Sequence, residues 1–282
     1  MAGKQQVGVG AAVQTFTKRD LGGRASLEGE AAGLSWLAEA ECDGGLHAAT
    51  VISVTGSELV EERIFTCAPT RDVARRAGTA LARTHAAGAA WWGCPPLGWE
   101  GSYRIDHSLT PTVAKADASS TWGAFYAEHR VMCYVRVLRD EGSLGPTEVS
   151  LFERLASRLE AGIFDAPQPG LVAGNGHQVA RLHGDLWAGN LLWDANPANP
   201  TGVAIIDPMA HGGHAETDLA MLQLFGCQHL DCLLAGYDEV SPLADGWQER
   251  VQLHQVAPLL LHCVLFGDSY LPATLRAARR YV

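Results

Sequence analysis

The amino-acid sequence predicts an α+β protein in which a small, mixed first part precedes a larger, mainly helical second part. Two observations carry this prediction. Strand-like and helical patterns alternate over the first seventy residues, and the apolar spacing is mostly helical from Thr70 onward. A chain of 282 residues suits one large domain or two lobes. We therefore expect a small lobe over residues 1–66 and a helical lobe over residues 67–282.

The first part shows three strand patterns and one helix pattern. Residues 12–18 alternate apolar and polar side chains, as a half-buried strand does. Residues 26–39 place their apolar side chains on one helical face, and Ser26 is a suitable N-cap. Two further strand-like runs, residues 49–55 and 59–65, are separated by the turn residues Gly56 and Ser57.

The second part is predicted to be mostly helix around three short strands. Helical spacing covers residues 70–87, 122–140, 146–161, 216–225, 247–266 and a C-terminal segment that ends at Val282. Strand patterns cover residues 179–182, 191–193 and 203–206. The stretch 94–119 is rich in Pro, Gly and Asp and is the longest segment with poor periodicity, so we expect a long loop there.

Composition excludes several classes of protein. The formal net charge is -10, from 21 Lys and Arg against 31 Asp and Glu, which argues against a nucleic-acid partner. The seven cysteines form no CxxC pair, so neither a zinc knuckle nor a disulfide framework is expected. Residues 1–10 lack the apolar core of a signal peptide, and the longest apolar stretch, residues 256–266, is short for a bilayer. We expect a cytoplasmic protein with no membrane partner.

The densest polar cluster lies in Arg181-Leu-His-Gly-Asp-Leu-Trp-Ala-Gly-Asn190, and a second carboxylate follows the strand that ends at Asp207. Phosphoryl transfer requires a carboxylate that accepts the proton of a hydroxyl and oxygen ligands for a magnesium ion beside the phosphates. Asp185 would be the base, and Asn190 and Asp207 the hard oxygen ligands that Mg²⁺ prefers.

These motifs resemble a known family. HGDLWAGN and IDP are similar to the catalytic and metal-binding motifs of the protein-kinase-like fold in its small-molecule branch, which aminoglycoside phosphotransferases and choline kinases share. Trp187, the run from Ile206 to Met221 and the aromatic helix from Trp122 to Arg130 resemble the fructosamine kinases (ketosamine 3-kinases) in particular. The resemblance covers roughly residue 14 to the end and implies a two-lobed kinase-like fold.

The resemblance implies ATP-dependent phosphorylation of the 3-hydroxyl of a ketosamine or glycated lysine, with Asp185 as general base and Mg²⁺ on Asn190 and Asp207. It assigns Lys18 to the ATP phosphates with Glu30 as its partner, and only three lysines exist as candidates. It also assigns a hinge segment to adenine and four residues to the substrate side. The hinge residues are Glu62, Arg63 and Ile64, and the substrate-side residues are Trp187, His183, His211 and Glu216. By residue type alone, His183 is a structural histidine and Glu216 a helix-start residue.

Three features depart from the family pattern. Only seventeen residues precede Lys18, no G-x-G-x-x-G motif exists, and Gly8-Val-Gly10 is at best a remnant, so we expect a shortened first lobe. Ala215 stands where the family usually has a basic residue, which predicts a missing ion pair. The segment from Tyr103 to Asp106 is a poor match to a substrate-facing loop of the family.

Three alternatives stay open at this stage. His211, His214 and Asp218 have the ligand types of a transition-metal site that activates water. A kinase for an aminoglycoside or another hydroxylated amine would share the same motifs. A non-catalytic, pseudokinase-like binding protein would agree with the missing glycine loop. The sequence leaves the sugar preference and the oligomeric state undetermined.

Overall fold

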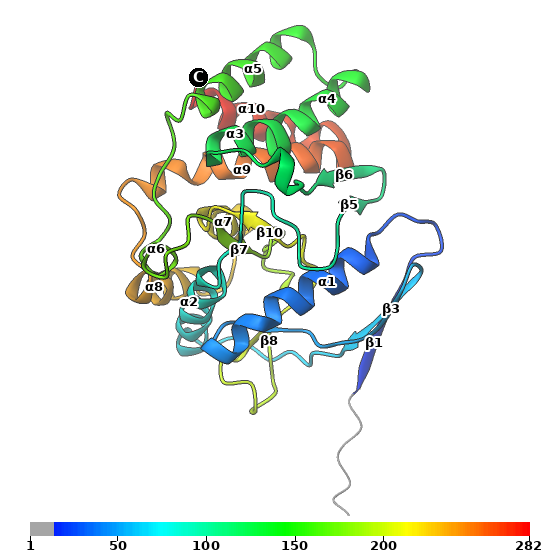
Figure 1. Cartoon of the computed structure of the whole chain (residues 1–282), viewed down its shortest axis with the longest axis vertical. Helices are drawn as coiled ribbons and strands as arrows, with labels where there is room; N and C mark the ends of the chain where they lie inside the picture. Colours follow the sequence, from blue (N-terminus) through cyan, green and yellow to red (C-terminus); the bar gives the residue numbers. More distant parts are fainter. Residues whose placement is uncertain (1–13) are drawn as a thin grey trace, which may run out of the picture.

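A computed structural model describes residues 14–282 and shows a small sheet with one long helix, followed by a mainly helical part (Figure 1). The Gly8-Val-Gly10 remnant and the predicted start of the first strand lie outside the described residues. The first part consists of β1 (Thr15–Arg19), α1 (Leu27–Ala38), β2 (His47–Ala48), β3 (Val51–Thr55) and β4 (Glu58–Glu62).

The three longer strands form one antiparallel sheet in the order β1-β4-β3. Lys18 of β1 lies opposite Leu59 of β4, and Phe16 lies opposite Glu61. The predicted turn at Gly56 and Ser57 joins β3 to β4. This register directs Lys18, together with Glu61, toward α1 and the rest of the molecule.

The apolar face predicted for α1 is buried, but Ser26 does not cap the helix. Its hydroxyl instead accepts the N–H of Arg104 at 2.7 Å and donates to the carbonyl of Ser102 at 3.2 Å. The start of α1 is thereby fastened to a hairpin formed by β5 (Ser102–Ile105) and β6 (Ser108–Pro111), which lies between α1 and the helical layer (Figure 1). The expected long loop over residues 94–119 therefore contains a hairpin.

The second part contains the predicted helices and two additional ones, α6 and α8. They are α2 (Arg71–Ala86), α3 (Trp122–Tyr126), α4 (Cys133–Asp140), α5 (Pro146–Glu160), α6 (Gly170–Gly174), α7 (Glu216–Leu224), α8 (Leu230–Val240), α9 (Trp247–Phe266) and α10 (Leu271–Arg279). The helix predicted over residues 122–140 is interrupted by a π-helical segment, Ala127–Met132, between α3 and α4. Such segments often occur at functional sites.

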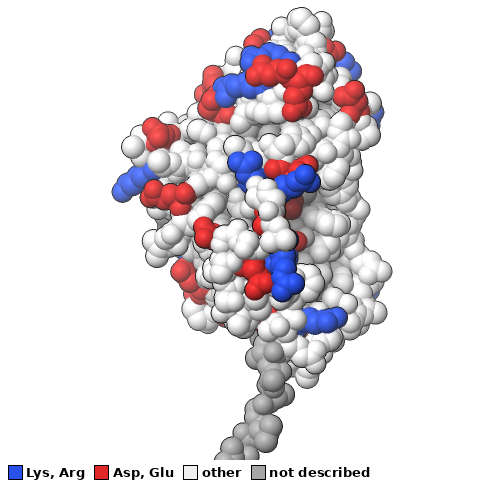
Figure 2. All heavy atoms as spheres, turned by 90° about the vertical axis from the view of Figure 1, so that its right-hand side faces the viewer, with Lys and Arg blue, Asp and Glu red and all other residues white. Residues whose placement is uncertain are grey.

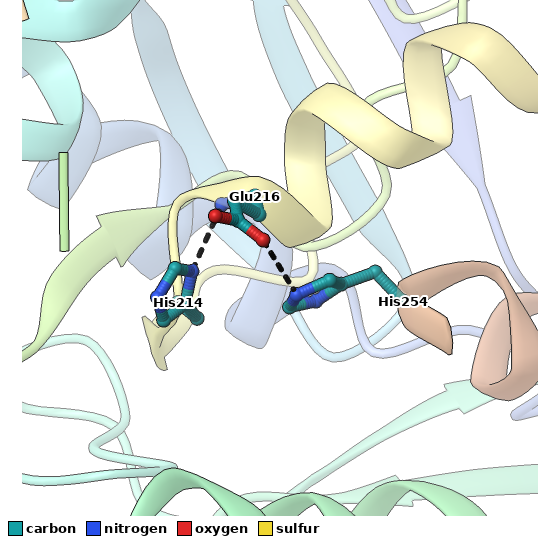
Figure 3. Close-up of side chains that lie close together, drawn as sticks. All are labelled: His214, Glu216 and His254. Atoms are coloured by element: carbon teal, nitrogen blue, oxygen red, sulfur yellow. Dashed lines mark hydrogen bonds and ion pairs between the residues drawn. The ribbon is translucent and has the colours of Figure 1, made fainter. Parts of the chain in front are cut away.

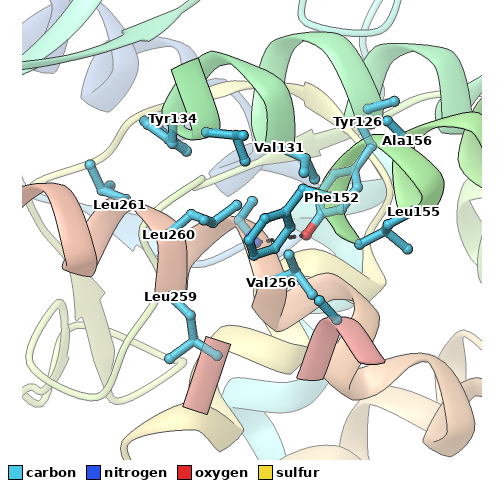
Figure 4. Close-up of a cluster of buried hydrophobic side chains, with 14 of the residues drawn as sticks. Tyr126, Val131, Tyr134, Phe152, Leu155, Ala156, Val256, Leu259, Leu260 and Leu261 are labelled. Carbon is cyan, nitrogen blue, oxygen red and sulfur yellow. Dashed lines mark hydrogen bonds between the residues drawn. The ribbon is translucent and has the colours of Figure 1, made fainter. Parts of the chain in front are cut away.

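The larger apolar core lies where α3, α4 and α5 pack on α9 (Figure 4). Phe152 of α5 and Val256 and Leu260 of α9 are fully buried there. The hydroxyl of Tyr126 donates to the carbonyl of Leu253 at 2.9 Å and accepts the N–H of Ala257, a residue that precedes Pro258 in α9. This packing fixes the position of α3, which continues directly into the π-helical segment.

A second core joins the two parts of the chain. Leu34 and Leu37 of α1 pack with Leu81 of α2 and with buried residues of the central strands. Because α1 shares this core, its position relative to the second part is set by apolar packing.

One helical segment, Trp247–Arg279, is long and apolar enough to cross a membrane by length and composition alone, with a mean hydropathy of 1.3 in its most apolar window. A core helix of a globular domain meets the same criterion. The α9 part of this segment carries Leu253, Val256 and Leu260, which are buried against the other helices (Figure 4). One face of α9 therefore packs in the core, and 39% of the most apolar window is buried.

Candidate active site

Two loops that follow short central strands form the base of the candidate site. β7 (Ala180–Leu182) pairs with β10 (His211–Gly213), and β8 (Leu191–Trp193) pairs with β9 (Val203–Ile205). β2 adds to β9 in parallel, which connects the first part of the chain to these strands. The pairing brings the loop between β7 and β8 next to the loop that follows β9.

The loop between β7 and β8 is fixed from below by the buried carboxylate of Asp218 on α7. Its two oxygens accept the backbone N–H groups of His183 at 2.7 Å and Gly184 at 3.0 Å, and His85 contacts it at 3.2 Å. Burial raises the pKa of Asp218, but the hydrogen bonds and His85 lower it overall. Asp218 therefore stabilises the backbone of this loop.

Gly184 is required by the backbone path of this loop. Its φ is +84°, and a Cβ at this position would collide with the carbonyl oxygen of Met209. Only glycine adopts this φ without strain while another backbone lies so close. The glycine of the His-Gly-Asp motif thus places the next residue, Asp185, at the mouth of the site.

Asp185 and Asn190 interact directly. The amide nitrogen of Asn190 donates to Oδ2 of Asp185 at 3.1 Å and to its backbone carbonyl at 2.9 Å. Burial, assisted by the negative charge of Asp207, raises the pKa of Asp185 to about 7. A carboxylate with a pKa near neutrality is suited to accept a proton.

Asp207 follows β9 and has a left-handed backbone with φ of 56°. Its carboxylate bonds Lys18 of β1, which also bonds Glu30 of α1 and lies 3.8 Å from Glu61 of β4. Burial lowers the pKa of Lys18, whereas Glu30, Asp207 and Glu61 raise it overall. The structure thus brings together the predicted lysine, its predicted partner and the predicted metal ligand.

The segment expected to face adenine directly follows β4. The N–H of Glu62 donates to the carbonyl of Thr50 at 2.8 Å, and the N–H of Arg63 donates to that of Gln14 at 2.9 Å. Among the described residues, the N–H of Ile64 has no backbone partner. Of the three predicted backbone donors, only Ile64 is therefore available to a nucleotide.

Of the four substrate-side residues, only Trp187 borders open space. The side chain of Trp187 is 41% exposed. Its indole lies against Gly189, where any Cβ would collide with the ring. Together with Asp185, Asn190 and Asp207 it lines a cleft of about 300 Å³, which Arg104 and Tyr103 of the hairpin also border. The segment from Tyr103 to Asp106 therefore faces this cleft despite its poor match to the family pattern.

The other three substrate-side residues are buried away from the open cleft, and His211 lines a small cavity that adjoins it. His183 is buried, and its Nε2 lies 2.8 Å from the carbonyl of Ile206, so it is the structural histidine that its residue type indicated. His211 is buried, and its Nδ1 lies 2.8 Å from the carbonyl of Met209. Glu216 is buried and fully paired, as described next. None of the three borders the open cleft.

Glu216 also corrects the prediction of a missing ion pair at Ala215. Arg250 of α9 bonds both carboxylate oxygens of Glu216, at 2.9 and 2.6 Å, and His254 lies 3.3 Å away. Although burial acts in the opposite direction, His254 and Arg250 lower the pKa of Glu216 to about 2. The cation absent before Glu216 is supplied from another helix.

The proposed transition-metal cluster of His211, His214 and Asp218 does not form within residues 14–282. His214 instead lies beside Glu216 and His254 (Figure 3). The ring nitrogens of His214 contact the N–H of Glu216 and the carbonyl of Ala166, each at 3.2 Å. Both ring nitrogens of His214 already make contacts, and Arg250 bonds both carboxylate oxygens of Glu216. His214, Glu216 and His254 therefore form a structural network of hydrogen bonds and ion pairs.

Two residues near the site were not found from the sequence. Glu61 lies beside Lys18, and one of its oxygens is buried without a partner among the described residues. Arg130 is a buried arginine below Asp185. The strand alternation of residues 59–65 could have placed Glu61 on the inner face, whereas no sequence pattern distinguishes Arg130 from an exposed arginine.

The family model described as fructosamine kinase matches residues 14–282. A probable ketoamine kinase of Lactiplantibacillus plantarum is 33% identical over 184 residues, which cover 64% of this chain and 60% of the relative. The probable ketoamine kinase YniA of Escherichia coli is 31% identical over 194 residues, which cover 69% and 58%. The chain thus matches about three-fifths of the length of these curated relatives.

Solved structures agree with these matches. A structure named as a putative fructosamine-3-kinase from Thermobifida fusca has 36% identity and a TM-score of 0.79, covering 95% of this chain and 85% of that one. The choline kinase LicA of Streptococcus pneumoniae shares the fold, with a TM-score of 0.57 at 16% identity over 96% of this chain and 86% of that one. The predicted kinase-like α+β fold is thereby confirmed, and the chain belongs to the fructosamine kinase family.

Proposed function

We propose that this protein is an ATP-dependent kinase that phosphorylates the 3-hydroxyl group of a ketosamine, with Asp185 as the general base. The observation that carries the proposal is the arrangement of Asp185, Asn190 and Asp207 around one cleft, with Lys18 bonded to Asp207. Family membership supports phosphoryl transfer to a small hydroxylated acceptor.

In this mechanism the acceptor hydroxyl lies against Asp185 in the cleft. Its proton passes to the Asp185 carboxylate while its oxygen bonds the terminal phosphorus of ATP and the bond from that phosphorus to ADP breaks. The pKa of Asp185, raised to about 7 by burial and by Asp207, makes the carboxylate a stronger base than an exposed aspartate. Its bond from Asn190 fixes the direction of the free oxygen.

The nucleotide would be held from the opposite side of the cleft. Lys18 would hold the phosphates, oriented by Glu30, and the N–H of Ile64 would donate to adenine. The amide nitrogen of Asn190 is engaged with Asp185, which leaves its oxygen for a cation, and Asp207 supplies a carboxylate that is 42% exposed. These oxygen donors fit Mg²⁺, which when bound neutralises the charge of the phosphates.

The test is ATP consumption with Mg²⁺ in the presence of fructosyl-lysine, ribulosyl-lysine or an aminoglycoside. We expect turnover with at least one of the two ketosamines and a loss of about 10²- to 10⁴-fold in Asp185→Asn. Asp140→Asn, at an exposed aspartate at the end of α4, is the matched control and should retain full activity.

The outcomes separate the alternatives. Turnover of the aminoglycoside alone would support a kinase for another hydroxylated amine. If no ATP is consumed with any of the three acceptors, the result would support a non-catalytic binding protein. An Asp185→Asn variant that keeps its rate and its fold would contradict the assignment of the base.

A further inference from the structure

Arg130, in the π-helical segment between α3 and α4, is a buried cation whose hydrogen bonds are only partly made. Its side chain is 6% exposed. Nη1 donates to the carbonyls of Pro111 and His129, each at 2.8 Å, and the guanidinium lies 4.8 Å from the ring of Phe125. Nε and Nη2 are buried and have no partner within residues 14–282.

The charge of Arg130 is also unpaired in the described part of the chain, where no carboxylate lies within ion-pair distance of it. The side chains that contribute most to its electrostatic environment after burial are Tyr134, Cys133, Tyr103 and Tyr126, and none of them carries a charge at pH 7. A buried cation without a counter-charge is strongly unfavourable unless a ligand completes its environment. The missing component is therefore an acceptor that carries negative charge.

Arg130 borders a small internal cavity of about 40 Å³ that adjoins the catalytic cleft. Asp185 and Met209 line both spaces. A cavity of this size has room for about two or three water molecules, or for one carboxylate group. A group that enters it from the cleft would pass directly beside Asp185.

Several of the other polar groups around this cavity already have hydrogen-bond partners. The hydroxyls of Thr110 and Tyr134 bond each other, and Nδ1 of His211 lies 2.8 Å from the carbonyl of Met209. The unpartnered Nε and Nη2 atoms lie on the same edge of the guanidinium, and this edge matches the two oxygens of a carboxylate. Both the charge and the donor geometry at this position are complementary to a carboxylate.

We propose that Arg130 binds a carboxylate of the acceptor, so that the preferred acceptor is a ketosamine formed on the α-amino group of a free amino acid. This inference rests on the proposed kinase function. In such a compound only C2, C1, the amine nitrogen and the α-carbon separate C3 from the carboxylate carbon. That short span suits a cavity that shares Asp185 with the cleft. In ketosamines formed on the ε-amine of lysine the carboxylate lies a further side chain away.

The test uses two acceptors that differ only in charge, N-fructosyl-glycine and N-fructosyl-glycinamide. For the wild-type protein we expect kcat/KM for the carboxylate to exceed that for the amide by about 10- to 100-fold. This ratio should fall toward one in Arg130→Met. Arg130→Lys, which keeps the charge without the two-donor edge, should give an intermediate ratio. Arg136→Met, at an exposed arginine on α4, is the control and should keep the wild-type ratio.

Direct binding of the same two compounds, measured by calorimetry on the wild-type protein, tests the inference even if no turnover is detected. A tighter Kd for N-fructosyl-glycine by about tenfold or more would support it. Equal Kd values, or equal kcat/KM values together with active turnover, would overturn it and leave the kinase function intact. A wild-type preference that persists unchanged in folded Arg130→Lys would overturn it as well.

Discussion

The two sides of the cleft are built in different ways. On the side of the catalytic loop, buried Asp218 fixes the backbone of His183 and Gly184, and Asn190 fixes Asp185. On the opposite side, one lysine on the β1 strand is shared by three carboxylates, and an oxygen of Glu61 is buried without a partner among the described residues. Hydrogen bonds within the fold therefore determine the geometry around Asp185, whereas charge balance determines the geometry around Lys18.

On the face shown in Figure 2, acidic and basic side chains are interspersed. Exposed charges farther from the cleft than a Debye length are largely screened, so the cleft depends mainly on its own side chains. Substitutions on the two sides should accordingly have different consequences for stability and for activity.

The largest effect is expected for Asp218→Ala, which removes the carboxylate that stabilises the backbone of the catalytic loop. Two buried backbone N–H groups and His85 would lose their acceptor, at a cost of about 3–5 kcal/mol in the free energy of unfolding. Activity should be lost together with stability because Asp185 follows directly. Urea unfolding and the ATP-consumption assay measure both effects.

Asp72→Ala, at an exposed aspartate of α2, is the control for Asp218→Ala and should change the unfolding free energy by less than about 0.5 kcal/mol. An Asp218→Ala protein that keeps both its stability and its activity would show that Asp218 is not needed to fold the loop. That result would contradict the conclusion that hydrogen bonds within the fold determine the geometry on the Asp185 side of the cleft.

Lys18→Met should show the opposite pattern, with a large loss of activity and a small loss of stability. Removal of one donor to a transferring phosphoryl group costs about 10²- to 10³-fold in rate. The fold should persist because Lys18 lies on an edge strand, and the carboxylates left behind can take up protons. The steady-state rate and the unfolding midpoint are measured together, with Lys115→Met at an exposed lysine as control. Unchanged turnover would remove Lys18 from the phosphate site.

The sequence predicted the parts of the site that depend on local spacing. Asp185, Asn190 and Asp207 could be recognised because short strands and tight loops fix their separation in the chain. The pairing of Lys18 with Glu30 was implied by the resemblance to the family, and the two side chains are bonded in the structure. The buried positions of His183, His211 and Glu216 could not be predicted, because they depend on partners such as Ile206, Met209 and Arg250 that are remote in sequence or join through backbone carbonyls.

The hairpin of β5 and β6 was missed for a similar reason. Its strands are four residues long, and Ser26, far away in the sequence, fixes their position through two hydrogen bonds. Arg130 was missed because a buried and an exposed arginine look the same in a single sequence. Its burial follows from the packing of α3 to α5 on α9 (Figure 4).

The smallest effect concerns His47 of β2, on the side of the cleft that carries Lys18. It lies between Glu41, in the 3-10 segment after α1, and Glu62, at the end of β4. Its ring nitrogens lie 3.2 Å from Glu41 and 3.0 Å from Glu62. The hydrogen bond that the ring donates to Glu41, together with the charges of Glu41 and Glu62, raises the pKa of His47 to about 9, although burial acts in the opposite direction. The ring is therefore protonated at neutral pH in the folded protein, where an unfolded histidine is mostly neutral.

Because the folded pKa lies above the unfolded value, the stabilisation from His47 is complete below about pH 6.5 and is lost as the pH rises through about 9. It amounts to at most about 3 kcal/mol. The difference in unfolding free energy between wild type and His47→Gln, measured in urea, should thus shrink between these two pH values. A difference that stays constant with pH would mean that hydrogen bonds, and not charge, hold this side together, as they do around Asp218.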